Sequence, residues 1–367
     1  MVRNQNRGQG VWNLSGLALR VAQSLGMHRD GTKLGLSPYE TEIRRRVWWH
    51  LVVRDGRAAE DYGINSPSAT PGFDTELPLN IEDADLTPEM TTLPSGRNGW
   101  TGMTYPLVAI NISHAMRQLG ILEISGQNTT WKELERNRIM KELKTTLDTM
   151  LQSCNRAIPI QKAALLVATL VFTKVDLVTR HQAESRVAEG TRKSAPAEND
   201  LIAACEALET SNDLWFDELL RHYRWLTASY PQTHLLLYVY WHLCLCPKGP
   251  TTDRAWKSAN IARDIEIQKQ EISLVPKHSF KFVVLDRLKR RAELVRDSVS
   301  DDSPEEQHHQ QGAGQGGQCA TTSNLIAVGL GDGAISPPPE NVEWANIIQG
   351  IPDWATLVED LLSIVPA

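Results

Sequence analysis

Residues 37–63 read SPYETEIRRRVWWHLVVRDGRAAEDYG, and this stretch decides the fold class. It opens with a serine, a proline and, three residues after the serine, Glu40, which is the capping-box pattern that starts an α-helix. No glycine or proline interrupts the pattern before Gly56. Its aliphatic residues recur at helical spacing and predict an apolar stripe with Trp48 beside it: Ile43, Val47, Leu51 and Ala58.

The same helical period covers almost all of the chain before residue 297. The first helix places an apolar set on one face, and Gly26 follows where a left-handed residue ends a helix; the set is Leu14, Leu17, Ala18, Val21, Ala22 and Leu25. Further helices are expected over residues 105–122, 131–154, 161–181, 201–223, 231–246, 253–271 and 279–297. The helix from Gln161 is apolar on nearly every side and should be central. We therefore predict an all-α fold.

The composition divides the chain into three parts. Residues 1–297 form the helical body, and residues 298–340 are polar and rich in glycine and glutamine, which predicts a disordered linker. Residues 341–367 mix acidic and bulky apolar residues and contain no basic one. Their apolar residues recur at near-helical intervals (Trp344, Ile347, Trp354, Leu357 and Leu361), so we expect this tail to activate transcription or dock a coactivator, or else to pack back on the helical body.

Charge and hydropathy limit the partners of the protein. Its net charge is −6 and its pI is about 6.0, which argues against direct binding to DNA. The longest apolar run, Ala163–Phe172, is too short to cross a bilayer, so no membrane contact is expected.

Few residues suggest catalysis or metal binding. His28, Arg29 and Asp30 spell the start of a kinase catalytic loop, but the other kinase motifs are absent, and we interpret them as polar residues after a helix end. His242, Cys244 and Cys246 alternate within a helical pattern, where they cannot converge on one ion. We predict no catalytic residue, no metal site and no enzyme activity.

The arginine run Arg44, Arg45 and Arg46 allows three interpretations: contact with nucleic acid, a solvated face, or pairing with acids. The third fits best, because the following segment supplies carboxylates that arginine can grip with two bonds (Asp74, Glu76, Glu82, Asp83 and Asp85). Trp48 and Trp49 point about 100° apart on a helix, so we expect one in the core and the other against a neighbouring helix or the Phe73 segment.

Three motifs carry a family resemblance: GLALRVAQSLGMHRD, LSPYETEIRRRVWWHLVVRDGRAAEDYG and FDTELPLNIEDADLTP. In this order they resemble the fungal-specific transcription factor domain, the middle homology region of fungal binuclear zinc cluster regulators, most strongly over residues 16–88. The resemblance implies an all-α regulatory domain in a nuclear regulator of transcription. It assigns structural roles to its motif residues, namely Arg44, Arg45, Arg46, Trp48, Trp49, Asp55, Arg57, Phe73, Asp74, Pro78 and Asp85.

The cysteine motif that forms the zinc cluster of that family does not occur in this sequence. It needs six cysteines in a compact basic segment, and this sequence has five, scattered from Cys154 onward. We therefore expect no zinc and no other cofactor, and either a gene product truncated at its start or a regulator without direct DNA contact. The segment RDGRAAEDYG resembles the corresponding segment of regulators found beside secondary-metabolite gene clusters. Expected partners are coactivators or other regulators and a small-molecule effector; the alternative is a small-molecule sensor that does not itself regulate transcription.

Overall fold

The structure is a computed structural model, and it describes residues 9–62, 72–125, 127–187, 197–228, 231–272 and 280–301. Within these ranges the regular elements are helices and no strand occurs, which confirms the predicted all-α fold. The α-helices are α2 (Gln9–Ser24), α3 (Pro38–Tyr62), α4 (Thr104–Ile124), α5 (Thr129–Leu151), α6 (Pro159–Val187), α7 (Glu198–Phe216), α8 (Arg224–Thr227), α9 (Thr233–Leu245), α10 (Thr252–Ile272) and α11 (Phe280–Asp301), with 3-10 turns η2 (Asp83–Asp85) and η4 (Glu218–Tyr223).

The ends of α2 and α3 follow the sequence signals. Gly26 has a φ of +71°, and the amides of Gly26 and Met27 donate to the carbonyls of Gln23 and Ala22, which is the Schellman arrangement that ends a helix. At the start of α3 the Glu40 amide donates to the Ser37 hydroxyl, and the Ser37 amide donates to the Glu40 carboxylate. Both predicted caps are confirmed.

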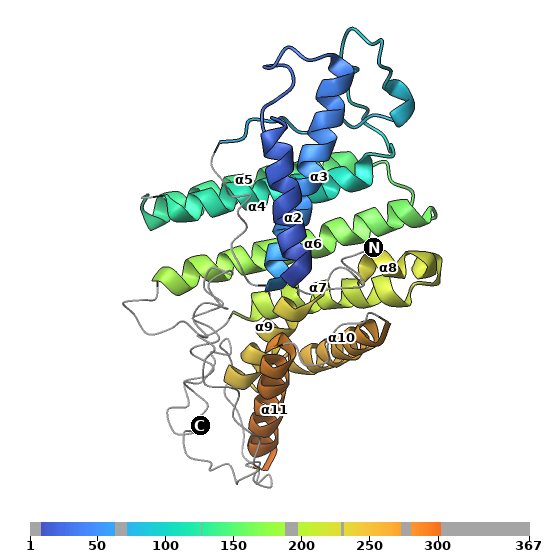
Figure 1. The fold of residues 1–367 in the computed structure, drawn as a ribbon. Helices are drawn as coiled ribbons and strands as arrows, with labels where there is room; N and C mark the ends of the chain where they lie inside the picture. The colour runs from blue at the N-terminus through green and yellow to red at the C-terminus, as the bar shows by residue number, and fades with distance from the viewer. Residues whose placement is uncertain are drawn as a thin grey trace.

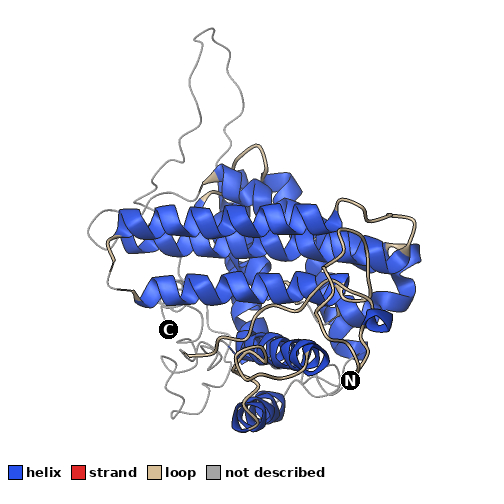
Figure 2. Ribbon diagram, turned by 90° about the horizontal axis from the view of Figure 1, so that it is seen from above, coloured by secondary structure: helices blue, strands red, loops and turns tan. Residues whose placement is uncertain are grey.

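The helices are arranged in a succession that follows the chain. The antiparallel pair α2 and α3 crosses the stack formed by α4 to α7, and α9, α10 and α11 lie beyond α7 (Figure 1). Seen from above, the long helices run alongside one another (Figure 2). α6 packs against α4, α5 and α7, so it lies at the centre, as its apolar sequence predicts.

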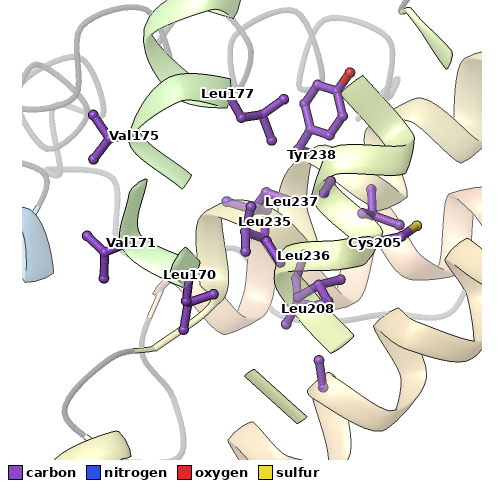
Figure 3. Close-up of a cluster of buried hydrophobic side chains, with 14 of the residues drawn as sticks. Leu170, Val171, Val175, Leu177, Cys205, Leu208, Leu235, Leu236, Leu237 and Tyr238 are labelled. Atoms are coloured by element: carbon purple, nitrogen blue, oxygen red, sulfur yellow. The ribbon is translucent and has the colours of Figure 1, made fainter. Parts of the chain in front are cut away.

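The main core extends from α4 to α11. Its centre is where α6, α7 and α9 meet, and the buried side chains there are labelled in Figure 3 (Leu170, Val171, Val175, Leu177, Cys205, Leu208, Leu235, Leu236, Leu237 and Tyr238). A second, smaller core lies between α2, α3 and the start of α4: Leu19, Ala22, Trp48, Trp49, Val52, Leu107 and Ile110. This smaller core positions the site described below.

The two predicted apolar stripes are wrong in part, although Ala22 of the α2 set is buried as predicted. On α2 the inward residues are Leu19 and Ala22, whereas Leu14, Leu17, Val21 and Leu25 are each more than half exposed. On α3, Ile43 and Val47 are exposed, and the buried face carries the two tryptophans and Val52. Each helix is apolar on two sides, and helical period alone does not decide which side faces the core.

Three helices end four or more residues away from their predicted ends. α6 runs to Val187, six residues beyond the predicted end at residue 181. The helix predicted over residues 201–223 ends at Phe216, because the Asp217 side chain accepts the Leu219 amide and starts the turn η4. The last helix, α11, runs to Asp301, four residues beyond the predicted end of the helical body at residue 297. The described helices include none that is long and apolar enough to cross a membrane.

Candidate functional site: an arginine network between helix α3 and its neighbouring loops

Arg45 is at the centre of the motif region. Its side chain is almost fully buried, and its Nε and Nη2 atoms donate to the two carboxylate oxygens of Asp30 at 2.8 and 3.0 Å. Nη2 also donates to Glu76 at 2.6 Å. Helix α3 is thereby fixed to the turn after α2 and to the extended segment after residue 72. Because Arg45 and Asp30 are out of water, neither charge has solvent to replace its partner.

Asp30 is held by more than the arginine. Its carboxylate accepts hydrogen bonds from the amide and hydroxyl of Thr32 and from the Glu76 amide, and its own amide donates to Asp74. Burial opposes ionisation of Asp30, but the bonds from Arg45, Thr32 and Glu76 outweigh it and hold the pKa of this carboxyl well below its ordinary value of 3.8. Asp30 is therefore ionised at neutral pH and anchors the turn after α2 to α3. It lies after the end of α2, as the sequence predicts, and its bonds to Arg45 add a role that the sequence does not predict.

Gly31 follows Asp30 and touches α3 directly. A Cβ built at Gly31 would lie 2.8 Å from the Thr41 Cα and 2.5 Å from its hydroxyl oxygen. Thr41 itself is fully buried. Only glycine permits this close approach of the two backbones, which places Asp30 beside Arg45.

Arg46 forms the second half of the network. Its Nε donates to Glu42 at 3.0 Å, and its Nη1 donates to the exposed Asp83 at 2.6 Å. Glu42 is fully buried, accepts the Leu79 amide, and has one oxygen without a hydrogen-bond partner. Burial raises the pKa of Glu42 despite the bonds from Arg46 and Leu79. We call Asp30, Glu42, Arg45, Arg46, Glu76 and Asp83 the arginine network.

Arg44 differs from its two neighbours. Its Nη2 donates to the Leu25 carbonyl at the end of α2, at 2.6 Å. The arginine run thus pairs as predicted with Glu76 and Asp83, but through Arg45 and Arg46 only. Of the other acids in that segment, Asp74 pairs with Arg29 and Lys33, Asp85 pairs with Arg97, and Glu82 accepts the Gly102 amide.

The two tryptophans pack beside the network. Both are buried to 1% exposure, so the smaller core takes both rings rather than one. Both rings meet the Phe73 ring edge-on, at centroid distances of 5.2 and 5.5 Å. The Trp49 Nε1 donates to the Glu76 carbonyl, and Arg117 of α4 covers the ring of Phe73 at 3.9 Å. The aromatic group thus fixes the 72–77 segment against α3 and α4.

The remaining motif residues lie around this cluster or further along α3. Pro78 is buried in the extended segment. Asp55 is fully buried and Arg57 partly so, but Asp55 is ten residues after Arg45, which is about 15 Å along the helix. They are therefore separate from the network. The tail residues Trp344, Ile347, Trp354, Leu357 and Leu361 lie outside the described residues.

The site is structural: its charged groups hold chain segments together. The charged groups are matched to one another, and their geometry joins three chain segments. In the described part of the chain, no three His, Cys, Asp or Glu side chains converge as metal ligands would. His242 is buried on α9, and the Cys244 sulfur contacts the Leu288 carbonyl.

These contacts belong to an all-helical domain whose N-terminal helices are joined by buried arginine–carboxylate pairs, and comparison with known proteins identifies its class. The chain is related to fungal regulators of transcription. Residues 3–152 match the family described as the fungal specific transcription factor domain, and this part of the chain is such a domain. The match extends from α2 to the end of α5 and so includes the whole arginine network.

Similar curated proteins carry matching names. The chain is 27% identical to the aurofusarin cluster transcription factor aurR2 of Gibberella zeae, over 67% of this chain and 37% of that protein. It is 27% identical to the pyriculol/pyriculariol biosynthesis cluster transcription factor 1 of Pyricularia oryzae, over 68% of this chain and 34% of that protein. A C6 finger domain transcription factor of Aspergillus fumigatus, nscR, is 35% identical over 32% of this chain and 15% of its own.

The chain spans about a third of the length of the first two relatives. No solved structure matches it. The family and the names of these relatives are those of regulators of transcription.

Proposed function

We propose that these 367 residues regulate transcription in the nucleus through contacts with other proteins, and that they do not read DNA themselves. The observation that carries the proposal is the fungal specific transcription factor domain over residues 3–152. The sequence has five cysteines, none before Cys154, and therefore no compact six-cysteine segment to hold a zinc cluster. The proposal assigns no metal or cofactor to these residues, so dialysis against a chelator should leave the thermal midpoint unchanged.

The arginine network supports the part of the proposal that concerns DNA. Arg45 and Arg46, which sequence alone left as candidates for phosphate contact, are bound to carboxylates. A guanidinium that already has an ionic partner adds little to a phosphate footprint. The network instead makes a rigid scaffold of α2, α3 and the 72–85 segment, and a rigid surface suits recognition of a partner protein.

The proposed activating element is the tail, residues 341–367. It has four acids and no basic residue, and its bulky apolar residues recur at helical intervals. Acids keep such apolar groups solvated in the free chain, and the segment can then fold into a coactivator's hydrophobic groove. The proposed targets are genes of a secondary-metabolite cluster, because two of the relatives above are named as regulators of such clusters.

The second candidate is a sensor of small molecules. A surface hollow of about 490 Å³ lies between α7 and α10, lined in part by Glu209, Asn212 and Arg254. Three of its polar groups are already bonded to each other, because Glu209 accepts from Arg254 and from Ser258. A ligand would have to break these pairs, so the hollow favours the protein-contact function over the sensor.

A tethered reporter tests the proposal. The full chain is fused to an unrelated DNA-binding domain in yeast, and expression of a reporter behind that domain's site is measured. We expect activation that falls at least fivefold when Trp354 and Leu357 are both changed to Ala. The matched control changes Trp131 and Leu134 to Ala, two exposed residues of α5. No change in reporter expression with the full chain, or activity indifferent to Trp354 and Leu357, would contradict the proposal.

A further inference from the structure

Helix α2 presents an apolar face that no described part of the chain covers. Leu14, Leu17, Val21 and Leu25 are 58%, 59%, 51% and 58% exposed, and they are spaced three or four residues apart. Four large aliphatic side chains at this spacing form a stripe along the helix. Such a stripe is uncommon on a free surface and marks a docking site. We call these four residues the α2 stripe.

The surroundings of the α2 stripe favour a negatively charged occupant. Residues 13–29 contain two arginines and no acid. Arg20 is exposed beside the stripe, and Arg44 lies at its far end, bonded to the Leu25 carbonyl. Among the described residues neither Arg20 nor Arg44 has a carboxylate partner. Cations next to an apolar stripe fit a helix that carries acids and lacks basic residues.

Outside the described helices, the chain contains a segment of that composition. Residues 353–364 read DWATLVEDLLSI, and their bulky apolar residues (Trp354, Leu357, Leu361 and Ile364) are spaced three, four and three residues apart. The α2 stripe is spaced three, four and four residues apart. Two helices with apolar residues at this spacing can pack along their length. Asp353, Glu359 and Asp360 would then flank the contact, near the cations of α2.

The length of chain after α11 allows the contact within one molecule. α11 ends at Asp301, and 51 residues separate it from residue 353. A flexible segment of that length has a root-mean-square span of about 40 Å, and its extended limit is about 170 Å. The longest helix, α6, has 29 residues and is about 44 Å long. The linker is therefore long enough to reach α2 across the helical body.

We infer that the α2 stripe is the docking site of the chain's own segment 353–364, which binds it as an amphipathic helix with its acids beside Arg20 and Arg44. This interface is independent of whether the tail activates transcription. The competing face is on α11, where Arg287 and Arg290 are exposed and also suit an acidic segment. Among the described side chains of α11, Leu294 is the one large exposed aliphatic residue, so that face offers less apolar area.

Photo-crosslinking on the full chain tests the inference. A photoreactive phenylalanine analogue replaces Leu17 of the α2 stripe in one protein and Leu294 of α11 in a second. After irradiation and digestion, mass spectrometry identifies the captured peptide. An equal mixture of ¹⁵N-labelled and unlabelled protein separates capture within one chain from capture between chains. We expect position 17 to capture a peptide from residues 350–367 of its own chain, at least fivefold more than position 294 does.

A second variant is changed only in the tail, so its result does not depend on the folding of the helical body. Trp354 and Leu361 lie outside the described helices. Changing both residues to Ala should lower the capture at position 17 at least fivefold. Capture of the tail at position 294 instead, capture of a second copy at position 17, or no capture of the tail would each overturn the inference.

Discussion

Arg45 and Asp30 form a two-pronged ion pair that is out of contact with water, with side chains 4% and 0% exposed. The pair joins α3 to the turn after α2, fifteen residues earlier in the chain. An isolated charge in such a place is strongly unfavourable, so each partner depends on the other. The pair therefore makes Arg45 part of the scaffold that joins α2 and α3.

Single alanine changes in the arginine run should have unequal effects. Arg45→Ala leaves Asp30 charged and buried, and should lower the free energy of unfolding by about 3–5 kcal/mol. Arg46→Ala should cost about 1–2 kcal/mol, and Arg44→Ala, which loses one bond to a carbonyl, about 0.5–1 kcal/mol. Urea denaturation of the three variants gives the order. Arg45→Lys is the control for charge without the fork, and three equal small losses would rule out the network as a stabilising element.

Replacement of the two buried carboxylates of the network by amides should change the free energy of unfolding by unequal amounts. Asp30→Asn removes a charge that Arg45 needs and should cost about 3–5 kcal/mol. Glu42→Gln keeps an acceptor for Arg46 and Leu79 and removes a charge that burial disfavours. We expect Glu42→Gln to remain within about 1 kcal/mol of the original protein at pH 7. Thermal and urea unfolding of this matched pair measure the difference.

The pH dependence of the pair has a definite sign. The folded pKa of Asp30 is below its ordinary 3.8, so its contribution is complete above about pH 4 and is lost as the pH falls below that value. The deficit of Asp30→Asn should be constant from pH 7 to 5 and shrink below pH 4. The folded pKa of Glu42 is raised above 4.5, so its contribution is lost as the pH rises through that pKa, and Glu42→Gln should gain relative stability in the same direction. A deficit of Asp30→Asn that shrinks above pH 5 would contradict this assignment.

Local signals in the sequence predict most of the helices but not the contacts between them. The capping box at Ser37 and Glu40 and the glycine at position 26 are short-range patterns, and the structure has both. The pairing of Asp30 with Arg45 was not predicted, because the sequence around each residue contains no signal that identifies the other as its partner. The adjacent Gly31 is a signal that points there, since a glycine after an aspartate can mark a close approach of backbones.

The prediction of which side of each helix is buried was wrong for a related reason. α2 has aliphatic residues on two sides, and helical period rates the side with Leu14, Leu17 and Val21 above the side with Leu19. The buried side is chosen by Trp48 and Trp49, which need Leu19 and Ala22 as neighbours in the smaller core. That choice is made by tertiary packing, so only a structure reveals the exposed stripe.

Two glycines should respond in opposite ways to alanine. At Gly31 a methyl group would collide with the Thr41 backbone, and Gly31→Ala should cost about 1–3 kcal/mol. Gly16 lies inside α2 with open space around its Cβ position, so Gly16→Ala should stabilise by about 0.5–1 kcal/mol through helix propensity. Thermal melts of the two variants compare them directly. A neutral Gly31→Ala would mean that the turn after α2 can move away from α3.

Association of the full chain with DNA should be weak and sensitive to salt. The net charge is −6, and Arg45 and Arg46 are bound to carboxylates. Despite the negative net charge, α11 carries a basic stripe, with Arg287, Lys289, Arg290 and Arg291 within five residues. This stripe is the expected source of any residual binding, because closely spaced arginines displace the counterions of DNA without reading its bases.

A mobility-shift assay separates this residual binding from recognition of a sequence. We expect a shift at 50 mM salt that is lost by 200 mM, is the same for unrelated duplexes, and falls at least threefold when Arg287, Arg290 and Arg291 are changed to Gln. The matched control changes Arg20, Arg29 and Arg54, three arginines of the α2 and α3 region, to Gln; it removes the same charge and should lower the shift less. If the chain selected one sequence at physiological salt, it would have to contact base edges, and the proposal that it acts on transcription only through other proteins would be wrong.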